Sequence, residues 1–216
     1  MNLKAPYNEV ASTWPESGRH ILASHDEDSV IVYQAYRPAI GRYAASNQHF
    51  GGEYSFSRMS WIKPNFLWMM YRSGWGRKEG QEVTLAVTIP RTLFDEILAI
   101  AVPSTFEASR YRDANDWKEA LATSEVRLQW DPDHAPDGAP QQRRAIQLGL
   151  RGDILRRYAE REVIRIEDIS GFVAEQREFL KDRDKLLVPV ESTYRPLREG
   201  AAENIALDSF EPFAAP

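Results

Sequence analysis

The spacing of the apolar segments constrains the fold of this chain most. Its β-branched and aromatic runs are no longer than a strand and stop at prolines, as in SVIVYQAYRP (residues 29–38) and EVTLAVTIP (residues 82–90). Helical periodicity follows these two runs, with Pro38 and Pro90 suited to first turns. Because most connections are too short or irregular for a repeating βαβ unit, the sequence predicts an α+β fold in a single domain.

Apolar runs and turn residues divide the chain into short elements. Strands are predicted at residues 29–36, 59–63, 82–89, 125–130, 144–150, 163–166 and 186–190. Helices are predicted at residues 39–48, 64–73, from Pro90, after Asp113, from Gly152 and at 168–182. The segment DPDHAPDGAP (residues 131–140) has a loop composition and is expected to stop the strand before it. The domain is expected over residues 21–195, with residues 1–20 as an arm lying on it or trailing from it and residues 196–216 as a partly ordered tail.

Composition excludes several classes of protein. With 43% apolar and 27% charged residues among 216, the chain has enough apolar surface for a core. A net charge of −5 argues against a coat of nucleic acid over the whole molecule, although a local basic face is compatible with it. The absence of cysteine excludes disulfides and a cysteine nucleophile, and the four histidines lack metal-ligand spacing, so no metal site is expected. Because no apolar run is long enough to cross a bilayer, we expect a cytoplasmic protein without membrane contact.

Basic and aromatic residues are concentrated in one stretch. Between Tyr54 and Lys78 there is no acidic residue, and the basic ones are Arg58, Lys63, Arg72, Arg77 and Lys78. Eight aromatic residues lie close by: Phe50, Tyr54, Phe56, Trp61, Phe66, Trp68, Tyr71 and Trp75. Because arginine pairs with phosphate and flat rings stack on bases, this pattern favours a nucleotide ligand. The alternative is that the aromatic side chains form core and the basic residues a solvated rim.

Two glutamines stand inside predicted strands. Gln34 is the one strongly polar residue of VIVYQA, and Gln147 alternates with Ile146 and Leu148 in RAIQLGL. If those two apolar residues face the core, Gln147 faces a cleft or solvent, and Arg144 lies on the side of Ile146. Each glutamine is either satisfied by protein neighbours or aimed at a ligand. The motifs GxSxG, Walker A and GxGxxG are absent, which removes the commonest hydrolase, NTPase and dinucleotide-fold interpretations.

Four blocks of sequence carry a resemblance to a known family. The strand VIVYQAY before its proline-started helix, the run RMSWIKPNFLWMMYRSGWG, the strand VRLQWDPD and the segment RAIQLGLRG resemble domain-of-unknown-function family 4291 over about residues 20–175. That family implies no settled activity. A looser similarity connects the order of strands to the ADP-ribosyltransferases and to the RNA 2′-phosphotransferases of the same fold. It implies a split antiparallel or mixed sheet with flanking helices.

The looser similarity also implies roles for particular residues. It places Gln34 where those enzymes have His or Arg on the first strand, Ser60 beside Trp61 on the second, and Gln147 where they have a catalytic Glu. Gln34 and Gln147 both depart from that pattern, and an amide supplies no negative charge to an oxocarbenium-like transition state. The implied cofactor is NAD or another nucleotide, with transfer of ADP-ribose to a nucleic acid or a small acceptor. The catalytic candidates are Gln34, Ser60 and Gln147, and the nucleotide-binding candidates are Tyr36, Arg58, Trp61, Lys63, Arg72 and Arg144.

A function of a different class is compatible with the same basic and aromatic stretch. The chain could be a non-catalytic module that binds RNA or single-stranded nucleic acid. The two interpretations differ in salt dependence, because binding that neutralises several phosphates weakens steeply with ionic strength. The sequence gives no indication of an oligomeric state.

Overall fold

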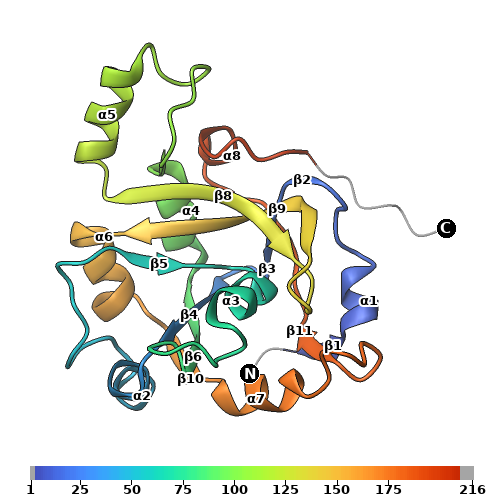
Figure 1. The fold of residues 1–216 in the computed structure, drawn as a ribbon. Coiled ribbons are helices and arrows are strands. Elements are labelled where there is room, and N and C mark those ends of the chain that lie inside the picture. Colours follow the sequence, from blue (N-terminus) through green and yellow to red (C-terminus); the bar gives the residue numbers. More distant parts are fainter. Residues whose placement is uncertain (1–2, 210–216) are drawn as a thin grey trace.

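The computed structural model describes residues 3–209, which form several sheets covered by short helices (Figure 1). The strands are β1 (Lys4–Pro6), β2 (Gly18–Arg19), β3 (Ile21–Ala23), β4 (Ser29–Tyr36), β5 (Ser60–Ile62), β6 (Val83–Pro90), β7 (Val102–Pro103), β8 (Val126–His134), β9 (Pro140–Leu150), β10 (Arg165–Asp168), β11 (Leu187–Pro189) and β12 (Ser192–Tyr194). The helices are α1 (Tyr7–Ala11), α2 (Pro38–Asn47), α3 (Phe66–Ser73), α4 (Arg91–Ala99), α5 (Ala114–Thr123), α6 (Gly152–Arg156), the π-helical turn η1 (Arg157–Arg161), α7 (Ser170–Arg177) and α8 (Ala201–Asn204). Within the described residues, none of these helices has the length and apolar character that a bilayer crossing requires.

Two larger sheets organise the domain and confirm the predicted α+β class. One is antiparallel with the order β10-β6-β4, and the other is mixed with the order β2-β9-β8-β7. The short strand β5 joins them. Ser60 to Ile62 pair with β9, and the next residue, Lys63, forms an isolated bridge with Tyr33 of β4.

The sheet that contains β4 is buried on both faces. Val30 and Val32 contribute to the core between the two sheets, whereas Ile31 and Tyr33 pack on the other side with α3 and α7. Continuous burial explains why the β4 sequence is apolar without alternation. A strand forms at the predicted residues 82–89, but the prediction that it is half-buried is wrong. Helix α7 covers the face that carries its threonines, and Thr84 is fully buried.

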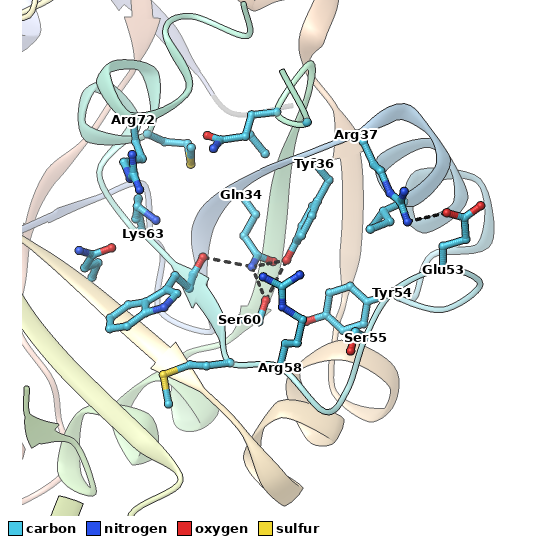
Figure 2. Close-up of a pocket in the computed structure, with 18 of the residues that line it drawn as sticks. Gln34, Tyr36, Arg37, Glu53, Tyr54, Ser55, Arg58, Ser60, Lys63 and Arg72 are labelled. Carbon is cyan, nitrogen blue, oxygen red and sulfur yellow. Dashed lines mark hydrogen bonds and ion pairs between the residues drawn. The ribbon is translucent and has the colours of Figure 1, made fainter. Parts of the chain in front are cut away.

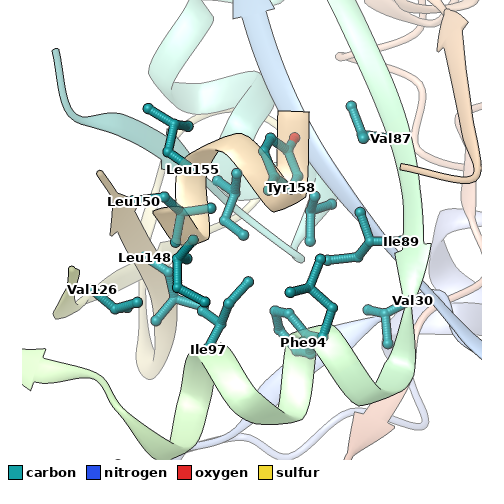
Figure 3. Close-up of a cluster of buried hydrophobic side chains, with 14 of the residues drawn as sticks. Val30, Val87, Ile89, Phe94, Ile97, Val126, Leu148, Leu150, Leu155 and Tyr158 are labelled. Carbon is teal, nitrogen blue, oxygen red and sulfur yellow. The ribbon is translucent and has the colours of Figure 1, made fainter. Parts of the chain in front are cut away.

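Helix α4 fills the space between the two sheets. Its side chains Phe94 and Ile97 are fully buried, and Figure 3 shows them between the β4–β6 sheet and the β9 residues Leu148 and Leu150. Tyr158 of η1 closes the same cluster and is itself fully buried. This core therefore fixes the relative position of the two sheets whose junction forms the candidate site.

Strand β8 continues beyond the predicted stop. Asp131 pairs with Ala145 and Pro132 with Arg144, and an irregularity lies between Pro132 and His134. The proline is tolerated because β7 covers only the start of β8, so at Pro132 the strand is an edge that needs no amide donor on its open side. The predicted loop is thus reduced to the hairpin turn at residues 135–139.

Both ends of the described chain pack on the domain. β1 pairs with β11, β2 pairs with β9, and Trp14 between them is buried, so the expected N-terminal arm lies on the domain. In the predicted tail, Ala201 and Ile205 are buried in the main core. The rest of that tail, residues 210–216, lies outside the described residues.

Candidate functional site

A cavity of about 950 Å³ opens where β5 passes from β9 to β4 (Figure 2). The end of β4, the loop before β5, β5 itself, α3 and the strands β8 and β9 contribute to its wall. Eight of the sequence-predicted site residues line it: Gln34, Tyr36, Arg58, Ser60, Trp61, Lys63, Arg72 and Gln147. The fold therefore brings together side chains that are up to about half the chain apart in sequence.

Arg144 does not line the cavity. It lies on β9, where its side chain is exposed and shares a face with Ile146 and Leu148, which are core residues. Gln147 alternates with them and lines the cavity from the opposite face. The period of the strand explains why Arg144 and Gln147 do not meet.

The turn from β5 into α3 positions two of the cationic side chains. Asn65 caps the helix, and its Oδ1 accepts a hydrogen bond from the Trp68 amide at 2.6 Å. The buried carboxyl of Glu191 accepts from the Phe66 amide at 2.7 Å, and burial raises the pKa of Glu191 well above its usual value. With this helix start fixed, Lys63 lies before α3 and Arg72 on its last turn.

Lys63 is a buried cation without a protein counter-ion. Its side chain is only 4% exposed, and among residues 3–209 its ammonium has no ion pair or hydrogen bond. Burial, followed by the charge of Arg72, lowers the pKa of Lys63 to about 8, and Asp131 acts in the opposite direction. Burying an unpaired ammonium is costly, so an anion in the cavity would stabilise this arrangement.

The remaining charges of the cavity add to this positive potential. Glu53 is the one carboxylate in the lining, and it is paired with Arg37 at 2.6 Å. Arg58 and Arg72 have no acidic partner in the described part of the chain. Figure 2 shows Lys63 and Arg72 together at one side of the cavity, with the Arg37–Glu53 pair at the other. Three cations are therefore available to a ligand in a chain that is acidic overall.

Gln34 is satisfied by the protein. Its Nε2 donates to the Tyr36 hydroxyl at 2.8 Å and to Ser60 Oγ at 2.9 Å, and its Oε1 accepts from the Tyr158 hydroxyl at 2.7 Å. Burial raises the pKa of Tyr36 and Tyr158 well above the usual range and that of Tyr54 to about 12, so these phenols stay protonated. Of the two alternatives for Gln34, the structure favours a side chain that fixes Tyr36 and Ser60.

Gln147 belongs to a polar cluster that the sequence analysis identified only in part. Its Nε2 donates to Gln129 Oε1 at 2.8 Å and to Asp131 Oδ2 at 2.6 Å. Gln129 lines the cavity as well. The alternation of VRLQW marks Gln129 in the same way as RAIQLGL marks Gln147, whereas Asp131 was assigned to a loop.

Most of the aromatic stretch forms core. Phe50, Tyr54, Phe66, Trp68 and Trp75 are buried. Trp61 differs, because it is half-buried and lines the cavity beside Gly149. Tyr71 is 47% exposed outside the lining. The core interpretation thus holds for five of the eight rings, and Trp61 is the ring most available to a ligand.

Comparison with known families agrees with the resemblance seen in the sequence. A family model described as "Domain of unknown function (DUF4291)" matches residues 20–194, which is most of the chain. No curated protein has a significant match to it. In the described residues, no three His, Asp or Glu side chains are grouped in a way that would hold a metal ion.

Proposed function

We propose that this chain, which belongs to the DUF4291 family, binds a phosphorylated nucleotide in the cavity at the β5 junction. The proposed cofactor is NAD, and the proposed reaction is transfer of ADP-ribose to a nucleic acid or a small acceptor. The observation that carries the proposal is Lys63. Lys63 is 4% exposed and lines the cavity, and its ammonium has no counter-ion among the described residues, so a phosphate bound in the cavity would stabilise it.

The rest of the cavity fits a dinucleotide. Its volume of about 950 Å³ is at the upper end of the range of about 300–1,000 Å³ that is typical of ligand pockets. Arg58 and Arg72 add two guanidinium groups, which pair with phosphate oxygens more strongly than neutral donors do. The half-buried ring of Trp61 supplies a surface for stacking.

The proposed reaction requires little more from the protein than positioning and charge. The bond between ribose C1′ and the nicotinamide nitrogen breaks with its electron pair leaving on nicotinamide, an acceptor oxygen or nitrogen bonds to C1′, and the acceptor proton goes to solvent. Positive charge develops on the ribose, and a nearby carboxylate stabilises it. A carboxylate next to the cavity is Asp131, which accepts from Gln147 at 2.6 Å and has no ion pair in the described chain. It is not itself part of the lining, so its negative charge would act on the ribose from behind Gln147.

Binding of NAD, ADP-ribose and ATP, measured by thermal shift and calorimetry, tests the proposal. We expect NAD to bind, and Lys63→Met and Arg72→Ala each to weaken binding by about tenfold or more. Arg144→Ala is the matched control, since it removes a cation from the same domain outside the cavity. A folded Lys63→Met protein that binds NAD as tightly as the wild type would contradict the proposal. Release of nicotinamide then tests the reaction.

A single-stranded nucleic acid is a second candidate ligand. Exposed side chains next to the cavity support it, because Arg72, Arg77 and Lys78 have no acidic partner among residues 3–209 and Tyr71 is 47% exposed. Oligonucleotide affinity should then fall steeply between low and moderate salt. A nucleotide enclosed at Lys63 should depend on salt much less, so a salt series distinguishes the two candidates.

A further inference from the structure

Gln129 and Gln147 form a cross-strand pair on the cavity face of the β8–β9 hairpin. They stand directly opposite each other in the register, and both line the cavity. Gln147 Nε2 donates to Gln129 Oε1 at 2.8 Å and to Asp131 Oδ2 at 2.6 Å. Because an amide nitrogen carries two protons, these two bonds use both of them.

These bonds also fix which way each amide group lies. Reversing the Gln147 amide would set its oxygen against the oxygens of Gln129 and Asp131, and reversing Gln129 would set two NH₂ groups against each other. Gln147 Oε1 is therefore left as an acceptor and Gln129 Nε2 as a donor. Neither atom has a hydrogen-bond partner within residues 3–209, so the pair offers one acceptor and one donor to a ligand in the cavity.

A primary carboxamide is complementary to this pair. Its NH₂ donates to Gln147 Oε1, and its carbonyl oxygen accepts from Gln129 Nε2. A carboxylate has no proton for Gln147 and would lie close to the negative charge of Asp131, which approaches Gln147 to 2.6 Å and has no ion pair in the described chain. Asp131 therefore acts twice, because it orients the amide and repels an anion.

A flat surface for the ring that carries the carboxamide lies beside the pair. Trp61 pairs with Gly149, two residues from Gln147 on the same face of β9. A Cβ at position 149 would lie 3.0 Å from Trp61 Cε2, so the glycine lets the indole approach the strand closely. An aromatic ring placed against Trp61 would bring its substituent towards Gln147.

We infer that Gln129 and Gln147, positioned by Asp131, select a ring that bears a primary carboxamide, as nicotinamide does, over the same ring with a carboxylate. This inference rests on the proposed function and identifies the end of the cavity where the carboxamide binds. Gln129 and Gln147 determine specificity, and Asp131 is a positioning residue that holds Gln147 and, through Gln147, Gln129.

The test compares NAD with its deamidated analogue, nicotinic acid adenine dinucleotide, by titration calorimetry. We expect the wild-type protein to bind NAD at least about tenfold more tightly, as expected for a site whose polar groups one ligand leaves unpaired. Asp131→Asn should reduce this ratio because the repelling charge is gone, and Gln147→Met should reduce it because the acceptor is gone. Gln129→Met should weaken both ligands equally, since carbonyl and carboxylate oxygens both accept its proton.

Asp137→Asn is the charge-matched control, because Asp137 lies in the turn of the same hairpin and outside the cavity. It should leave the ratio unchanged. Equal affinity of the wild-type protein for the two dinucleotides, or an unchanged ratio in both Asp131→Asn and Gln147→Met, would overturn the selection and leave NAD binding intact. Binding of neither dinucleotide by the folded wild-type protein would overturn this inference and the proposed function together.

Discussion

Replacing Lys63 by methionine should stabilise the protein without ligand while weakening its binding of nucleotide. Lys63 is 4% exposed, so most of its side chain is removed from water, and no acidic group among residues 3–209 forms an ion pair with its ammonium at the cavity wall. Methionine keeps an unbranched chain of similar length and carries no charge. The substitution therefore removes a desolvation cost that the wild-type fold sustains in the absence of a ligand.

The lowered pKa gives the size of this effect. The pKa of Lys63 falls from 10.5 to about 8, and a tenfold change in proton affinity corresponds to about 1.4 kcal/mol, so the ammonium costs the folded state about 3 kcal/mol at pH 7. Between pH 8 and 10.5 the unfolded chain holds more protons than the folded one, so wild-type stability rises with pH in that window. The gain from Lys63→Met should be largest below pH 8 and should vanish above pH 10.5.

Urea denaturation at pH 7 and at pH 9.5 measures the gain, with Lys118→Met on the exposed face of α5 as the control for replacing a lysine. In a domain of this size, each kcal/mol shifts the melting temperature by about 2–4 °C, so the effect is measurable in a thermal scan as well. A Lys63→Met protein that is less stable than the wild type at pH 7 would refute the reasoning, because it would show that the ammonium has a stabilising partner. Increased stability with lost NAD affinity is the combination expected of a binding residue.

Two further substitutions test the frame of the cavity. Gly149→Ala should lower the free energy of unfolding by about 1–3 kcal/mol and weaken NAD binding, because its Cβ would lie 2.6 Å from Met59 Sδ and 3.0 Å from Trp61 Cε2. Gly171→Ala is the control, because nothing lies within 4 Å of its Cβ, and it should have neither effect. Equal denaturation curves for the two variants would contradict this. Glu191→Gln should gain stability relative to the wild type as pH rises above 4.5, because the buried carboxyl, whose pKa burial raises, keeps a proton that the unfolded chain releases. A difference in melting temperature that stays constant from pH 5 to pH 8 would show that Glu191 ionises alike in both states.

Local patterns were enough to predict the elements that hold the cavity. The run SVIVYQAY gives β4 with its observed bounds, and Pro64 and Gly74 bracket α3. These predictions succeed because proline, glycine and apolar periodicity act within a few residues of themselves. The strand pairings are different. β5 pairs with β9, some 90 residues away, and Lys63 then bridges to Tyr33, which no local pattern specifies.

The site residues divide in the same way. Gln34 was identified by its strand, but the hydroxyl that satisfies its oxygen is that of Tyr158, 124 residues further on. Asp131 was assigned to a loop because Pro132 follows it, and the strand continues only because β8 is an edge at that point. Arg144 could have been separated from the cavity by its alternation with Gln147 alone. The surroundings of Gln34 and Asp131 depend on long-range pairing and could not be predicted, whereas the position of Arg144 followed from the two-residue period of its strand.

The three residues of β5 explain why a cavity forms at this point. A strand that pairs with β9 at Ser60 to Ile62 and bridges to β4 at Lys63 must leave one sheet as it enters the other, so side chains at the changeover have no strand beside them to pack against. On one side of the changeover Gln34 fixes Ser60 and Tyr36, and on the other Asp131 fixes Gln147. Both sets of side chains are held in place by hydrogen bonds before any ligand arrives, which lowers the cost of ordering them on binding. The Lys63 ammonium, Gln147 Oε1 and Gln129 Nε2 are left without a partner in the described chain, and these are the groups to which the proposed ligand would bind.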